Sequence, residues 1–127
     1  MKFGIRKMKI DERFEKISYT NQSNLIDQIS DLIMKKEPRL SKKAILQDID
    51  VRNKLGEGLM SLTVLSMHIQ DKLVQHDMVL YINLNRSFSY SSMTLHQKFN
   101  INKLVIIVVN PEHQLDHLSK LEDFIEN

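Results

Sequence analysis

The sequence contains no cysteine. This excludes a disulfide scaffold, a zinc–thiolate site, an iron–sulfur cluster and a thiol nucleophile within the chain. Glycine and proline are too scarce, at three and two residues, to form linkers. No apolar run approaches the roughly 18 residues that suggest a membrane span, and charged residues interrupt the first fourteen positions before the apolar region of a secretory signal develops. We therefore expect a cytoplasmic protein.

Length and composition predict one globular domain. The 127 residues leave room for a single core, and 42% hydrophobic with 27% charged residues is typical of soluble domains. We expect the domain to span residues 1–127, with a loose basic end over 1–6. The formal charge of +2 is too small to indicate a nucleic-acid binder. Lys2, Arg6, Lys7 and Lys9 leave that class as a minor alternative, because such short basic runs are usually solvated ends.

The first half of the chain predicts a strand followed by two helices. Alternating apolar residues predict a short edge strand within Lys7–Ser18. Apolar spacings of three and four then predict a helix that begins at a Ser23 or Asn24 cap and ends before Pro38. A second helix is expected after the capping residue Ser41, with Gly56 just beyond its end.

The second half predicts strands and a final helix. Met78–Leu84 and Leu104–Val109 are predicted strands, and the polar stretch Asn85–Lys103 between them is predicted to be a loop with at most one helical turn. Asn110-Pro111 ends the second strand, and an amphipathic helix is expected over His113–Ile125. Together these elements predict an α/β fold, a mixed β-sheet of about four or five strands sandwiched by helices.

Histidines are the candidate functional residues. The five are His68, His76, His96, His113 and His117. A single histidine is usually a surface residue or a satisfied core residue. His113 and His117 are four apart on the predicted last helix, so they would share a face that could bind a metal. Gln114, however, stands where helical zinc proteases place a general-base Glu, and no third ligand is visible. We expect no metal.

Two segments of the chain resemble one protein family. They are Arg52 to His68, RNKLGEGLMSLTVLSMH, and Asn110 to Leu121, NPEHQLDHLSKL. They are similar to the active-site segments of the enzyme IIA domain of the fructose/mannitol type, from the bacterial sugar phosphotransferase system. In that family an arginine at a helix end precedes an Ala-x-Pro-His motif that carries the phosphorylated histidine, and a His-Leu on the last helix supplies a second imidazole. Arg52 lies sixteen residues before His68, and His117-Leu118 lies 49 residues after it. The resemblance covers roughly residues 8–127.

The chain departs from the family pattern around His68. Asn53 replaces a Glu, Gly58 replaces a Thr, and Leu65 and Met67 replace the Ala and Pro before the histidine. These changes alter the turn that aims His68, because Gly and Pro impose backbone angles that other residues do not. Since related domains with eroded motifs end certain sugar-responsive transcription regulators, the resemblance implies regulatory rather than transport use.

The resemblance also implies a reaction and its partners. His68 would accept a phosphoryl group from the histidine phosphocarrier protein, His117 would hydrogen-bond it, and Arg52 would supply positive charge. No cofactor is implied. The usual acceptor is a cysteine of an enzyme IIB domain, which must lie on another chain or domain; regulator domains are the other expected partners.

Other interpretations remain open. Arg52 at a helix end would also complement the helix dipole, and His117 would also fit a solvated helix face. A IIA-like interaction module that is never phosphorylated is the alternative function, so whether the chain is an enzyme stays undecided. The family continues beyond the last helix, whereas this sequence ends ten residues after His117. A shortened domain would expose apolar surface and favour a partner or a homo-oligomer.

Overall fold

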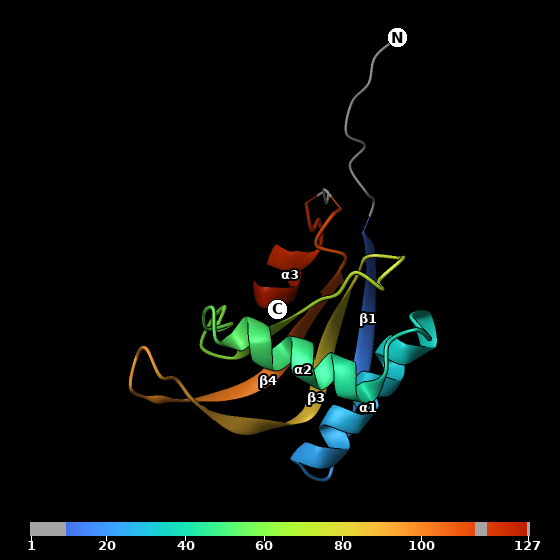
Figure 1. Ribbon diagram of the computed structural model, residues 1–127. Helices are drawn as coiled ribbons and strands as arrows, with labels where there is room; N and C mark the ends of the chain where they lie inside the picture. Colours follow the sequence, from blue (N-terminus) through green and yellow to red (C-terminus); the bar gives the residue numbers. More distant parts are fainter. Residues whose placement is uncertain (1–9, 114–116, 127) are drawn as a thin grey trace.

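A computed structural model describes residues 10–113 and 117–126 of the chain. It has a four-stranded sheet with helices on both faces (Figure 1). In chain order the elements are β1 (Asp11–Ile17), α1 (Gln22–Lys36), α2 (Lys42–Asn53), β2 (Val64–Gln70), β3 (Met78–Ser91), β4 (Lys98–Val109) and α3 (Leu121–Glu126). Within the described ranges, no helix has both the length and the apolar character that crossing a bilayer requires.

The sheet is mixed, with strand order β1-β3-β4-β2. β3 and β4 form an antiparallel pair at its centre, β1 lies parallel to β3, and β2 lies parallel to β4. The predicted α/β fold with four or five strands is therefore confirmed. The predicted N-terminal edge strand is also confirmed, as β1. The predicted loose end at residues 1–6 and the basic run from Lys2 to Lys9 lie outside the described residues.

Helix boundaries follow the capping side chains. Ser41 caps α2 as predicted, and its hydroxyl accepts a hydrogen bond from the Ala44 amide at 3.1 Å. The predicted cap of α1 at Ser23 or Asn24 is wrong, because the side chain of Asn21 accepts from the amide of Asn24 at 2.9 Å and starts the helix earlier. Gly56 is likewise not the residue that ends α2. Lys54 is the C-cap in a right-handed conformation, which needs no glycine.

The two faces of the sheet carry separate apolar clusters. The larger one packs the sheet against α1 and α2, and its helical members are Leu25, Ile29, Ile33 and Ile45. The smaller one packs the other face against α3; it comprises Ile10, Val64, Val79, Tyr81, Val105, Ile107, Val109 and Phe124. Within Leu104–Val109 of β4, odd and even positions therefore face opposite layers, as the period of a strand requires.

The polar stretch Asn85–Lys103 is a hairpin arm, so its prediction as a loop is wrong. β3 continues to Ser91 and β4 begins at Lys98, with Ser91 paired to Lys98 across the arm (Figure 1, gold to orange). The arm projects beyond the layered body, and most of its side chains are exposed. Its polar sequence reflects this exposure, and its backbone is still paired in a ladder.

The predicted helix over His113–Ile125 is also wrong in extent. His113 lies in a bend and His117 to Lys120 are not helical, so only Leu121–Glu126 forms α3. Polar contacts fix the described residues His113, Ser119 and Lys120 in non-helical positions. The imidazole of His113 is bound to a carboxylate of the sheet, and the amides of Ser119 and Lys120 donate to Glu12 at 3.2 and 3.0 Å. His113 and His117 therefore do not share a helical face.

Candidate functional site

His68 projects from the edge strand β2 toward the α3 side of the sheet. Its partner across the ladder is Ile107 of β4, a member of the smaller apolar cluster, and paired residues of parallel strands point to the same face. The imidazole is half-buried. Burial, reinforced by the positive charge of Arg52, lowers the pKa of His68 below its ordinary value. The ring is therefore neutral near pH 7, the state that a nucleophile requires.

Arg52 lies in the last turn of α2, the helix that packs against β2. Its guanidinium lies beside Gly56, where an added Cβ would be 3.7 Å from one terminal nitrogen. The charge of Arg52 contributes to lowering the pKa of His68, although the two residues are sixteen positions apart in sequence. A guanidinium offers a fork of donors that matches phosphate oxygens.

His117 is exposed in the connection that leads to α3. Its neighbour Leu118 packs against the smaller apolar cluster, which covers the face toward which His68 projects. The two histidines therefore belong to the same side of the sheet. A direct contact between their rings stays a prediction.

A close turn positions the start of β2. The amide and the hydroxyl of Ser66 both donate to the carbonyl of Gly58, at 2.7 and 2.9 Å, and the amide of Met60 donates to the carbonyl of Val64 at 2.9 Å. A Cβ on Gly58 would lie 2.0 Å from the carbonyl oxygen of Ser66. Only glycine fits here, and the strand that carries His68 depends on that fit.

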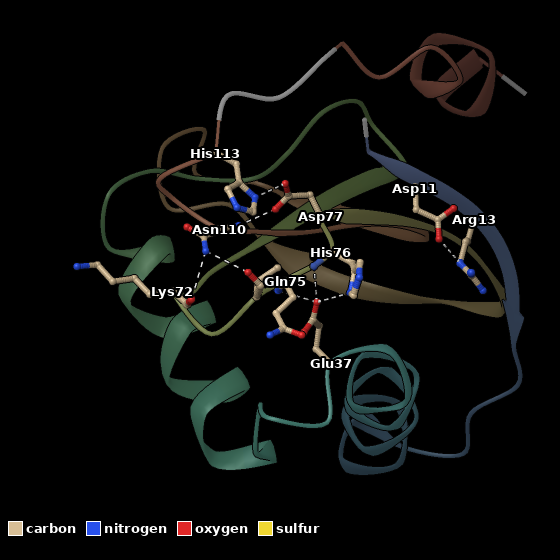
Figure 2. A network of polar contacts seen from close by, with 10 residues as sticks. Asp11, Arg13, Glu37, Lys72, Gln75, His76, Asp77, Asn110 and His113 are labelled. Atoms are coloured by element: carbon tan, nitrogen blue, oxygen red, sulfur yellow. Dashed lines mark hydrogen bonds and ion pairs between the residues drawn. The ribbon is translucent and has the colours of Figure 1, made fainter. Parts of the chain in front are cut away.

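Sequence reasoning missed a buried imidazole–carboxylate pair. Nδ1 of His113 lies 2.6 Å from Oδ2 of Asp77, whose side chain is 1% exposed. The other oxygen of Asp77 accepts from the amide of Asn110 at 2.8 Å, and the Asn110 side-chain amide donates to the carbonyls of Lys72 and Val74. Figure 2 shows this network at the end of β4. The carboxylate fixes the orientation of the His113 ring and leaves Nε2 for other contacts.

Register places this pair on the same side of the sheet as His68. Val79 belongs to the smaller apolar cluster, so Asp77, two residues earlier, projects to the same face. No pattern in the sequence predicts the pairing of Asp77 with His113, because the two residues lie 36 positions apart. The one feature of the sequence that pointed to this region was the predicted strand end at Asn110-Pro111, because residues that follow a strand, such as His113, lie at the edge of the sheet.

The two remaining histidines lie in connecting segments. His76 follows β2 in a loop that Glu37 anchors: the buried carboxylate of Glu37 accepts from the amides of Gln75 and His76 at 2.9 and 2.7 Å (Figure 2). His96 occupies the tip of the hairpin arm with a positive φ of 54°. Across residues 10–113 and 117–126, no three His, Asp or Glu side chains gather as metal ligands would.

Comparison with known proteins identifies the fold. No protein-family model and no curated protein matches the sequence. Among solved structures, the chain is similar to the nitrogen regulatory protein IIA-Ntr of Neisseria meningitidis, with a TM-score of 0.60 and 14% identity over 89% of this chain and 70% of that one. The fold is IIA-like. The structural likeness thus agrees with the resemblance to the phosphotransferase system but does not extend to the fructose/mannitol type.

Proposed function

We propose that this protein is a regulatory IIA-like domain whose His68 is phosphorylated by the histidine phosphocarrier protein. The observation that supports the proposal is the IIA-like fold, in a chain whose motif residues include His68 and Arg52, the latter lowering the pKa of His68. Both residues came from the sequence motif, and that motif is independent of the structural comparison. The same proposal has three finer parts. We propose that the domain is of the fructose/mannitol type, that it lies in the cytoplasm, and that its downstream partners are IIB or regulator domains.

The reaction needs few groups from this chain. A nitrogen of the neutral His68 ring attacks the phosphorus of the donor phosphohistidine, the bond to the donor nitrogen breaks, and the donor ring keeps the electron pair. Charge spreads over three equatorial oxygens in the transition state. Arg52 offers two or more N–H donors to those oxygens. The lowered pKa of His68 keeps its lone pair available near pH 7.

The second imidazole has two candidates. The family pattern assigns His117, and the structure adds His113, which Asp77 holds in a fixed orientation. An oriented ring loses less entropy when it binds a phosphoryl oxygen. The proposal keeps His117 as the expected partner of His68 and uses His113 as the comparison.

Phosphorylation with purified components tests the proposal. The protein is incubated with phosphoenolpyruvate, enzyme I and the phosphocarrier, and acid-labile phosphate is located by mass spectrometry. We expect label on His68, none in His68→Asn, and a rate at least about tenfold lower in Arg52→Ala, since a charge-assisted contact is worth about 1.5–3 kcal/mol. His117→Asn should slow the reaction more than His113→Asn.

The matched control is His76→Asn, which removes an exposed imidazole away from Arg52 and should be labelled like the wild type. Absence of label on the wild type, under conditions that label an authentic IIA domain, would refute the proposal and favour an unphosphorylated interaction module. A larger effect at His113 than at His117 would move the second role to the Asp77–His113 pair.

A further inference from the structure

A cavity of about 650 Å³ opens on the opposite face of the sheet from the one toward which His68 projects. Its walls come from α1, the segment between α2 and β2, the first half of β2, and the hairpin arm. Small-molecule sites in proteins commonly measure 300–1,000 Å³. The cavity therefore has the size of a site for a drug-sized ligand, and the phosphoryl chemistry proposed above does not use it.

The walls are mainly apolar. Leu25, Ile26 and Ile29 of α1 face Leu65 of β2 and Phe88 of the arm across the cavity. These residues belong to the larger apolar cluster or pack against it, apart from Ile26. A ligand placed here would bury apolar surface, which contributes about 25 cal/mol for each Å² removed from water.

The charged groups in the walls already have partners. Glu57 accepts hydrogen bonds from the hydroxyls of Tyr90 at 2.7 Å and Ser92 at 2.9 Å, and also from that of Thr94. Hydrogen bonds from Thr94, Tyr90 and Ser92 hold the pKa of Glu57 below its ordinary value, so it stays ionised and engaged. Lys54 pairs with Asp50 at 3.3 Å. The hydroxyl donors are neutral, so Glu57 keeps its negative charge, and Lys54 carries the opposite charge in the same walls. The walls therefore have no net charge that would favour a charged ligand.

The cavity is preformed. The bonds to Glu57 tie the hairpin arm to the segment that follows α2, so two walls are fixed to each other without a ligand. A site that is already ordered costs less conformational entropy on binding. Leu55 and Met93 line the same cavity and are 77% and 82% exposed. These flexible apolar side chains could fold over a bound molecule, as methionine often does.

We propose that this cavity binds an uncharged, mainly apolar small molecule, with the amides of Gln22 and Asn53 in its walls available to a single polar group. The proposal does not depend on His68, because its readout is binding rather than phosphorylation. A charged metabolite is not favoured, since the charges of Glu57 and Lys54 in the walls offset each other.

Binding of N-phenyl-1-naphthylamine, an uncharged fluorescent aromatic, tests the proposal on the whole chain. We expect saturable binding with one site per protein. Ile26→Trp should fill the cavity and weaken binding at least tenfold, and Ile26→Phe should weaken it less. The matched control is Val51→Trp, which adds the same ring at a residue that is 57% exposed and outside the walls. It should bind like the wild type.

The proposal fails if the dye binds without saturation, or if the Ile26 variants, shown by circular dichroism to be folded, bind it as the wild type does. It also fails if sedimentation shows a dimer that both the dye and Ile26→Phe dissociate, because the occupant would then be a second copy of the chain. A charged analogue, 1-anilinonaphthalene-8-sulfonate, should bind at least tenfold more weakly than the neutral dye; equal binding would refute the stated ligand class.

Discussion

Replacing Gly58 by alanine tests whether the close turn holds the strand that carries His68. The new Cβ would lie 2.0 Å from the carbonyl oxygen of Ser66, whereas ordinary contacts begin near 3.4 Å. The two segments would have to separate, and this breaks the bonds of 2.7 and 2.9 Å from Ser66 to the Gly58 carbonyl. Each is worth about 1 kcal/mol net. With the packing that is lost, we expect destabilisation by about 2–4 kcal/mol.

Gly56→Ala is the matched control, because its Cβ would meet Arg52 at an ordinary 3.7 Å. Gly-to-Ala changes without a clash stabilise by about 0.4–1 kcal/mol through the unfolded chain, so this variant should equal or exceed the wild type. Urea denaturation followed by circular dichroism measures both free energies of unfolding. Equal stability of the two variants would show that the approach of Gly58 to Ser66 is not tight, and the account of β2 positioning would be wrong.

Three further changes test polar side chains that are wholly or partly buried. Glu37→Ala, which removes an acceptor of two loop amides, should cost about 2–4 kcal/mol in urea, whereas Asp31→Ala on the exposed side of the same helix should cost under about 0.5 kcal/mol. Burial and the neighbouring Asp71 carboxyl raise the pKa of Asp48 to about 7, so the contribution of Asp48 to stability should fall as pH rises from about 4 to 7, and Asp48→Asn should gain stability relative to the wild type over that range. The pKa of His68 is lowered, so its own contribution should fall as pH drops below about 6.5; a stability difference between His68→Gln and the wild type that stays constant with pH would refute the assignment.

Strands and helices that are marked by residues within their own segment, such as an apolar run or a capping side chain, could be predicted from the sequence. The run Leu104–Val109 is apolar on both faces because two layers cover it, and Ser41 caps its own helix. The arm beyond Asn85 was missed although Phe88 and Tyr90, paired with Ile101 and Phe99, alternate with polar residues and pack against the larger apolar cluster. The many polar residues of the stretch outweighed this short alternation in the prediction. The last helix was overextended because Leu118, Leu121 and Ile125 keep helical spacing while only part of that segment is helical.

The residues of the candidate site likewise fall into those that the sequence could predict and those that it could not. Arg52 and His68 were singled out because a linear motif joins them, and their role in a site stays a prediction. The pair of Asp77 and His113 depends on a contact across the sheet, and no spacing in one sequence encodes such a contact. Long-range contacts of this kind override local propensity, which is also why residues 117–120 are not helical.

The pairing of the strands has a consequence for the order in which the chain can fold. β3 and β4 meet across a short turn, whereas sixty-seven residues separate Asp11 from its partner Met78. We therefore expect the outer strands β1 and β2 to pair only after the hairpin of β3 and β4 has formed. Closing a long loop costs entropy before the contacts that it allows can offset that cost. During synthesis, residues 10–70 emerge before either of their strand partners exists. A fragment ending at residue 75 should consequently remain unfolded, and the nascent chain should gain protection from proteases only after β4 has left the ribosome.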